Sequence, residues 1–308
     1  MNRSRSNPSL WIGGILVCLL LLIAIFGPFV APYDLDFQEK TSSTIVNGKT
    51  VIKTPPLEPS AQHLLGTDKW GYDLLTLLLH GARYTVFVTI AIALLRVLLG
   101  TIIGLYMGMS EEKQNWWITI ENAWSYIPIF IPVYFILLGV NVNSDLSTSA
   151  LIVLFIFLVT LLGMPSVVSS IRQKTEQIKN MQYIIAATSL GAGKNALIFR
   201  HILPQIKEQI VIVFVVEMVA IMTLMGQLGM FDLFVGGTKM TMDPPTFYSI
   251  THEWAGLIGS YRSFIYGSST WIYMSPLLAF IFAIAAFTLL SKGLRDRYQT
   301  TYHRTPYI

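Results

Sequence analysis

Cysteine and charged residues are both scarce in this chain of 308 residues. The single cysteine, Cys18, lies in an apolar run, so neither a disulfide framework nor a cysteine zinc site is available. Val17 stands where a lipid-anchor signal would place a small residue, so we do not expect Cys18 to be lipidated. Charged residues make up 12% of the chain and hydrophobic residues 53%, which exceeds the apolar share of soluble domains. The composition therefore predicts an integral membrane protein.

The chain also lacks the motif of a nucleotide-binding protein. The run GAGK at residues 191–194 is similar to part of a phosphate loop. The Walker pattern, however, needs a glycine five residues before the Gly-Lys pair and Ser or Thr directly after it, and this chain has Thr188 and Asn195 at those positions. We therefore expect that this chain binds no ATP itself.

Patterns for catalysis, metal binding and nucleic-acid binding are missing as well. No apolar run carries paired aspartates or a Gly-x-Ser-x-Gly motif, which argues against an intramembrane protease. His252 and Glu253 could suggest a metal pair, but adjacent side chains point apart, so we expect them in a solvated loop. The net charge of +4 is spread beside the apolar runs and forms no basic patch. The sequence predicts no enzyme activity, no cofactor or metal bound by this chain, and no nucleic-acid partner.

Long apolar runs dominate what is present. They predict an all-α integral membrane fold with six transmembrane helices, at residues 11–30, 84–109, 115–140, 149–170, 210–230 and 272–290. Basic residues gather at the N-terminus, in the loop of residues 172–207 and in the tail of residues 291–308, so both termini are expected in the cytoplasm. An odd number of spans would put either that loop or the tail outside.

The predicted spans divide the chain into four parts. Residues 1–30 hold the N-terminus and the first span, residues 31–83 form an external segment, residues 84–290 form a five-helix core, and residues 291–308 form the tail. Arg3 and Arg5 before the first run are compatible with a signal peptide. The run is too long for one and lacks a small-x-small cleavage site, which favours an uncleaved anchor.

The external segment of residues 31–83 contains two local patterns. Residues 42–52 alternate polar and β-branched types around an Asn-Gly pair, which predicts a β-hairpin. Residues 74–79 form an apolar ridge, which predicts a helix at the membrane interface.

The loop at residues 179–207 is a polar island between two apolar runs. Residues 183–190 are good helix formers, and Ala186, Ala187 and Leu190 fall on one apolar face. This part of the loop is therefore predicted to be a short helix on the membrane surface.

The rest of that loop predicts a turn and a second helix. Gly191 and Gly193 break the helical pattern and permit a reversal of direction. A second helical run at residues 196–202 follows, and Pro204 lies near the start of the next span, where its missing N–H costs little.

This loop resembles the cytoplasmic EAA loop of permease subunits from binding-protein-dependent ABC importers. The family pattern is Glu-Ala-Ala, three residues, Gly, nine residues and an Ile-x-Leu-Pro ending, and this chain has Ile185 at the Glu position. The run RHILP at residues 200–204 is similar to the ending in the peptide-importer branch. The resemblance implies a coupling helix inserted into a groove of an ATP-hydrolysing subunit. The residues that it assigns to this contact are Ile185, Ala186, Ala187, Leu190, Gly191, Arg200, His201, Leu203 and Pro204.

A second segment resembles the same branch. The run LGTDKWGYD at residues 65–73, followed by Gly-Ala-Arg at residues 81–83, is similar to a stretch before the second span of peptide-importer permeases. Its Thr-Asp pair is expected to cap a turn. Tyr72 and the Thr-Leu pair at residues 76–77 stand where family members usually carry Arg and Ser-Arg.

The resemblance implies a type I ABC importer permease (MetI-like) fold in the cell (cytoplasmic) membrane. It implies four kinds of partner: a second homologous permease, one or two ABC ATPase subunits, an extracellular solute-binding protein and the lipid membrane. ATP and Mg would be bound by the ATPases. The external loop at residues 231–270 is similar to the family loop that contacts the loaded binding protein. The branch imports peptides, nickel or metal-chelator complexes; a secondary transporter, the other alternative, would usually show more spans and two repeated halves.

Several residues within the predicted spans are candidates for the transport pathway. A lone Arg96 near the middle of its span would cost roughly 2.5 to 3.5 kcal/mol, so it should face a carboxylate, water or other protein. Glu121 and Glu217 are candidate partners, in a gate or in a structural pair. Tyr126 and Pro128 mark a site where a broken helix can line a cavity, with a simple packing kink as the alternative.

Overall fold

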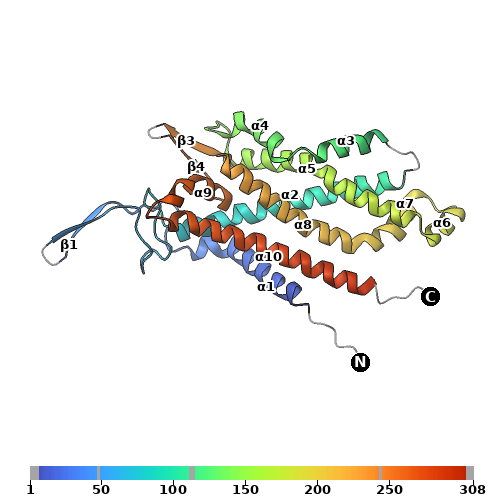
Figure 1. Cartoon of the computed structure of the whole chain (residues 1–308), viewed down its shortest axis with the longest axis horizontal. Helices are drawn as coiled ribbons and strands as arrows, with labels where there is room; N and C mark the ends of the chain where they lie inside the picture. Colours follow the sequence, from blue (N-terminus) through green and yellow to red (C-terminus); the bar gives the residue numbers. More distant parts are fainter. Residues whose placement is uncertain (1–6, 47–48, 111–114, 243–244, 303–308) are drawn as a thin grey trace, which may run out of the picture.

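The architecture is a bundle of long helices with β-hairpins at one end (Figure 1). The computed structural model describes residues 7–46, 49–110, 115–242 and 245–302. Within these ranges, five helices are long and apolar enough to cross a membrane. They are α1 (Pro8–Val30), α2 (Leu74–Gly108), α5 (Thr148–Lys179), the continuous helix Lys194–Met230, and α10 (Trp271–Tyr302).

A bent helix pair supplies a further candidate for a membrane crossing. The helices α3 (Asn115–Ser125) and α4 (Phe130–Asn141) are bent by 77° with respect to each other. The break falls at Pro128, which has no N–H to donate and disfavours a helical conformation in the residue before it. A broken backbone or a packing kink was expected at this proline site within the span of residues 115–140, and the structure has a break there.

The helix α2 begins ten residues earlier than the apolar pattern suggested. Asp73 caps its start, because its Oδ2 accepts a hydrogen bond from the backbone N–H of Thr76 at 2.8 Å. Residues 74–79 are therefore the first turns of α2, and no separate interfacial helix precedes it. The helix α5 is also longer than expected, so Arg172 and Lys174 lie on it and not in the loop that follows.

Glycines let neighbouring helices approach closely. Gly100, Gly104 and Gly108 form a row on α2, and a Cβ atom at these positions would lie 2.6 to 2.8 Å from atoms of α5. The helices α1 and α10 pack in the same way, because a side chain at Gly13 or Gly293 would overlap the backbone of the other helix. The helices α1 and α10, which are far apart in the sequence, thus pack directly against each other.

The two ends of the bundle carry different elements. We call the end that carries α6 (Gln182–Ser189) the α6 end; α1 begins and α10 ends towards it (Figure 1). We call the opposite end the hairpin end. There α9 (Trp254–Tyr261) and the short 3₁₀ helix η2 (Arg262–Tyr266) precede α10.

Two antiparallel hairpins lie at the hairpin end. β1 (Ser42–Val46) pairs with β2 (Lys49–Lys53), as the sequence predicted, and the Asn-Gly pair between them lies outside the described residues. β3 (Thr238–Met242) pairs with β4 (Pro245–Ser249), which was not predicted. The fold is therefore mostly but not entirely helical.

The segment before α10 is packed into the bundle and is not a surface loop. Trp254 is 3% exposed, and its indole N–H donates to the carbonyl of Leu78 at 2.8 Å. Glu253 is 1% exposed and caps α9 by accepting from the N–H of Ala255 at 2.8 Å. The expectation of a solvated loop at His252 and Glu253 is wrong, because this carboxylate satisfies the start of a buried helix.

Candidate coupling segment and intramembrane ion pair

The helix α6 divides its apolar residues between two sides. Ile184 is 1% exposed and belongs to a core cluster with residues of α2, α5 and η1, and Ala187 packs against that cluster. Ile185 and Leu190 are 54% and 89% exposed, and Ala186 is exposed beside them. The predicted apolar face is therefore split. Ile184, which the pattern did not single out, anchors the helix, while its neighbours are presented to the outside.

Gly191 ends α6 in a left-handed conformation, with φ of +86°. The N–H of Ala192 donates to the carbonyl of Ala187 at 3.1 Å, and the N–H of Gly191 donates to that of Thr188 at 2.9 Å. These two bonds are the Schellman arrangement, which favours glycine at the left-handed position. The predicted glycine elbow is confirmed at Gly191. Gly193 has an ordinary negative φ and begins the next helix.

The second helix of the loop continues directly into a membrane-crossing helix. It starts as α7 (Lys194–Ala196), passes through the π-helical segment η1 (Leu197–Ile202) and becomes α8 (Leu203–Met230). The N–H of Leu203 donates to the carbonyl of Ile198, five residues back, immediately before Pro204, which has no N–H. Arg200 and His201 lie on the exposed side of η1.

Arg96 of α2 is 3% exposed and is held by two other helices. Its Nη1 forms an ion pair with Oε2 of Glu217 on α8 at 2.8 Å. Its Nε and Nη2 donate to the carbonyl of Val159 on α5 at 3.1 and 2.6 Å. The hydroxyl of Ser166, also on α5, donates to Oε1 of Glu217 at 3.4 Å. Of the two partners that the sequence left open, the structure places Glu217 on Arg96.

Gly163 makes this arrangement possible. A Cβ atom at Gly163 would overlap the guanidinium of Arg96, so only glycine leaves room for the arginine between α2 and α5. Neither Gly163 nor the carbonyl of Val159 was predicted as part of this site. The sequence signal available was a small residue, Gly163, within an apolar run, which is typical of a close helix contact but does not identify the arginine as the neighbour.

The other candidate residues lie apart from this ion pair. Glu121 of α3 forms an ion pair with Arg172 of α5 at 3.5 Å, and Arg172 also binds Glu176 at 2.9 Å. Tyr126 is 86% exposed and Pro128 is exposed, both at the break between α3 and α4. The structure therefore brings together Arg96 and Glu217 but not the other members of the predicted set.

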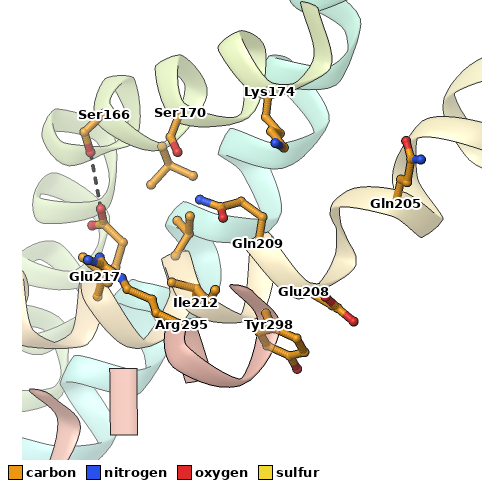
Figure 2. A pocket seen from close by; sticks show the side chains of 13 residues that line it. Ser166, Ser170, Lys174, Gln205, Glu208, Gln209, Ile212, Glu217, Arg295 and Tyr298 are labelled. Atoms are coloured by element: carbon orange, nitrogen blue, oxygen red, sulfur yellow. Dashed lines mark hydrogen bonds between the residues drawn. The ribbon is translucent and has the colours of Figure 1, made fainter. Parts of the chain in front are cut away.

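A cavity of about 540 Å³ lies beside the ion pair, between α5, α8 and α10. Figure 2 shows Ser166 and Glu217 on one wall, joined by their hydrogen bond, with Lys174 on α5 and Gln209 on α8. Arg295 of α10 also lines the cavity. The cavity lies in the half of the bundle towards the α6 end.

Comparison with protein families identifies the class. Residues 96–300 match the family described as binding-protein-dependent transport system inner membrane component. Residues 1–56 match the N-terminal TM domain of oligopeptide transport permease C. Because the first match covers more than half of the chain, the chain belongs to the family of inner-membrane components of binding-protein-dependent transport systems. With its apolar helices, it is a multi-pass protein of the cytoplasmic membrane.

Several characterised relatives are similar over most of the chain. The di/tripeptide transport system permease protein DppC of Pseudomonas aeruginosa is 27% identical over 289 residues, which cover 92% of this chain and 86% of the relative. The oligopeptide transport system permease protein OppC of Bacillus subtilis is 30% identical over 213 residues, 69% of this chain and 63% of the relative. The glutathione transport system permease protein GsiD of Escherichia coli is 27% identical over 295 residues, 96% of this chain and 87% of the relative.

Proposed function

We propose that this chain is a permease subunit of an ABC importer for peptides. It forms the translocation pathway with a second permease, receives solute from an extracellular binding protein, and is driven by separate ATPase subunits that bind ATP and Mg. The names of the relatives support peptides as the solute, since they are permeases of di/tripeptide, oligopeptide and glutathione transport systems. The family supports delivery by a binding protein.

The proposed membrane topology has six spans, with both termini in the cytoplasm. In it, α3 and α4 together make the third span, and the α6 end faces the cytoplasm. The observation in its favour is that α1 begins and α10 ends towards the α6 end, which also holds the basic residues Lys179, Lys194 and Lys207.

Coupling to the ATPase takes place at the outward side of α6. The observation that carries this proposal is the exposure of Leu190 and Ile185 on a helix whose inner side is fixed by Ile184. Exposed large apolar side chains on a polar loop favour a protein contact. Arg200 and His201 are exposed on η1, and Leu203 and Pro204 are the first residues of α8 after η1. Movement of α6 would thus be passed to a continuous helix through the membrane.

The ion pair of Arg96 and Glu217 holds together the helices that move during transport. Because Arg96 binds both α5 and α8, the helices α2, α5 and α8 are joined through a buried guanidinium. Three helices that are tied in this way move as one body when the ATPases close. We infer that Tyr126 and Pro128, which are exposed at the break in the third span, face the pathway or the second permease.

Uptake of a labelled tripeptide tests the proposal as a whole. Cells or vesicles that contain this chain, the second permease, the ATPases and the binding protein should accumulate radiolabelled trialanine, and only with ATP. Loss of the chain should abolish uptake. Trialanine that accumulates equally without the chain or without ATP would contradict the proposed function.

Gly191 gives a sharper test of the coupling role. Gly191→Val places a β-branched residue at a positive φ, at a cost of about 1 to 3 kcal/mol that disturbs the elbow. Nothing lies within 4 Å of the added Cβ, so the spans should stay folded. We expect uptake to fall by about fivefold or more while ATP hydrolysis continues. Gly191→Asn is the matched control, because asparagine tolerates this conformation, and it should keep uptake near the level of the unmodified chain.

A further inference from the structure

The cavity beside the ion pair is lined by regularly spaced polar residues. On α8, Gln205, Glu208, Gln209 and Glu217 share one face with the spacing i, i+3, i+4 and i+12, a stretch of about 18 Å. The facing side of α5 carries polar residues at a spacing of four, ending at Lys174. Within the predicted spans, Ser166, Ser170 and Glu217 are the polar lining residues, and polar groups there are costly unless they face protein or a water-filled space. The other polar lining residues lie beyond the predicted spans towards the α6 end, so the cavity extends from that end into the membrane-crossing part of the bundle.

Among the described residues, three charged groups on the cavity wall have no partner of opposite charge. Glu217 is already neutralised by Arg96. Within the described part of the chain, neither Lys174 nor Arg295 has a carboxylate within 4.0 Å, and the Nζ of Lys174 has a 3.4 Å hydrogen bond to Gln177. Glu208 likewise has no cation within that distance there. Two cations and one carboxylate on the wall are therefore available to a ligand.

We propose that this cavity is a transit site for a peptide, in which Lys174 and Arg295 bind the terminal carboxylate and Glu208 binds the terminal ammonium. This inference rests on the proposed function. Two cations complement a carboxylate, the amide of Gln209 suits a peptide bond, and a volume of about 540 Å³ lies within the range of small-ligand pockets. The net positive wall predicts that the carboxylate matters more than the ammonium.

Protection of a single cysteine from labelling tests the site directly. Cys18 is the only cysteine, so Cys18→Ser gives a background into which Ser170→Cys puts one thiol on the cavity wall. The complete transporter is placed in inside-out vesicles and treated with a membrane-impermeant maleimide. Trialanine at twice its dissociation constant should slow labelling about threefold. Trialanine with an amidated C-terminus should give little protection. A cysteine at Lys292, an exposed residue of α10 outside both the cavity and the coupling segment, should label equally with and without peptide.

Charge-removing variants give a second, matched comparison. Lys174→Gln with Arg295→Gln should abolish protection, whereas Lys207→Gln, an exposed lysine of α8 that does not line the cavity, should retain it. Labelling of the Lys292 cysteine and protein abundance check that the variants fold. If the double variant does not fold, the comparison of trialanine with its amide still decides the matter, since it uses unmodified cavity charges.

The other possible outcomes would each overturn either the transit site or the proposed function. Equal protection by trialanine and its amide, or no protection in a transporter that performs ATP-driven uptake, would overturn the transit site and leave the proposed function standing. Absence of uptake by the unmodified transporter would overturn the proposed function and this inference with it. Labelling that responds to replacing phosphatidylglycerol by phosphatidylcholine, but not to trialanine, would assign the cavity to an anionic lipid headgroup and overturn the peptide site.

Discussion

The hydroxyl of Tyr261 on α9 donates a hydrogen bond to Oδ2 of Asp68 at 2.9 Å. The other carboxylate oxygen of Asp68 accepts from the backbone N–H groups of Trp70 and Tyr72, each at 2.9 Å. This single carboxylate therefore fixes the turn before α2 and attaches it to α9, 193 residues later in the chain. Burial raises the pKa of Asp68, and burial beside this carboxylate raises the pKa of Tyr261 well above its usual value.

Removal of this hydroxyl should weaken the hairpin end. Tyr261→Phe leaves the Oδ2 atom of Asp68 without its donor in a buried place, so we expect a loss of about 1 to 3 kcal/mol in the free energy of unfolding. Thermal unfolding of the purified protein in detergent measures it. Tyr266→Phe, at a residue that is 95% exposed, is the control and should change little. Equal effects of the two substitutions would show that the bond does not matter.

The ion pair of Arg96 and Glu217 predicts strongly non-additive substitutions. Glu217→Leu leaves a buried guanidinium without its counter-charge, and Arg96→Leu leaves a buried carboxylate; each should cost about 3 to 5 kcal/mol. The double variant removes both charges and should be more stable than either single variant. Unfolding measured for all four proteins gives the coupling energy. Costs that simply add would contradict a direct interaction between the two side chains.

Gly163 should tolerate no side chain. Gly163→Ala places a methyl group onto the guanidinium of Arg96, so we expect a loss of about 1 to 3 kcal/mol from overpacking and displacement of the arginine. Gly139→Ala on α4 is the matched control, because nothing lies within 4 Å of the added Cβ. It should be neutral or slightly stabilising, since alanine favours a helix over glycine. A stable Gly163→Ala protein would mean that the arginine has room elsewhere.

Two adjacent residues at the hairpin end should give opposing pH dependences of stability. Burial raises the pKa of Glu253 from 4.5 to about 7, so this group stabilises the fold at low pH and loses that contribution as the pH rises from about 4.5 to 7. Burial, with the nearby His80, lowers the pKa of His252 from 6.5 to about 4, so its contribution grows as the pH rises from about 4 to 6.5. Each is on the order of 3 kcal/mol, and together they nearly cancel.

Single substitutions should reveal the two opposing pH dependences of stability. Glu253→Gln leaves the histidine, so unfolding temperatures should rise between pH 4 and 6.5. His252→Asn leaves the glutamate, so they should fall between pH 4.5 and 7. Asparagine is chosen because His252 has a φ of +54°, which asparagine also accepts. Thermal unfolding across this range measures both, and slopes of the same sign in the two variants would contradict the assignment.

Local chemistry predicted the elements that depend on few residues. The apolar runs predicted the long helices, Asn-Gly predicted the first hairpin, and glycine predicted the elbow after α6, since each signal acts within its own segment. The start of α2 at Leu74 was missed because its first turns pack against protein, and hydropathy alone cannot separate that surface from an interfacial one.

Contacts between side chains of different helices could not be predicted from local sequence patterns. Glu121 and Glu217 are similar residues in similar apolar surroundings, and only the packing of α5 between them decides which one reaches Arg96. Glu253 was misjudged because its polarity suggested solvent, whereas tertiary packing uses it as a buried cap. The coupling residues of α6 were proposed from the spacing of the family motif, and the outward exposure of Leu190 is an independent reason to keep them.

The close packing of α1 on α10 through Gly13 and Gly293 also bears on how the molecule is made. The helix α1 is synthesised well before α10, so their interface cannot form until α10 has been made. Before α10 has been made, the main neighbour of α1 is α2. A chain truncated before residue 271 would therefore expose the Gly13 face of α1 to lipid, or to the quality-control proteases of the membrane.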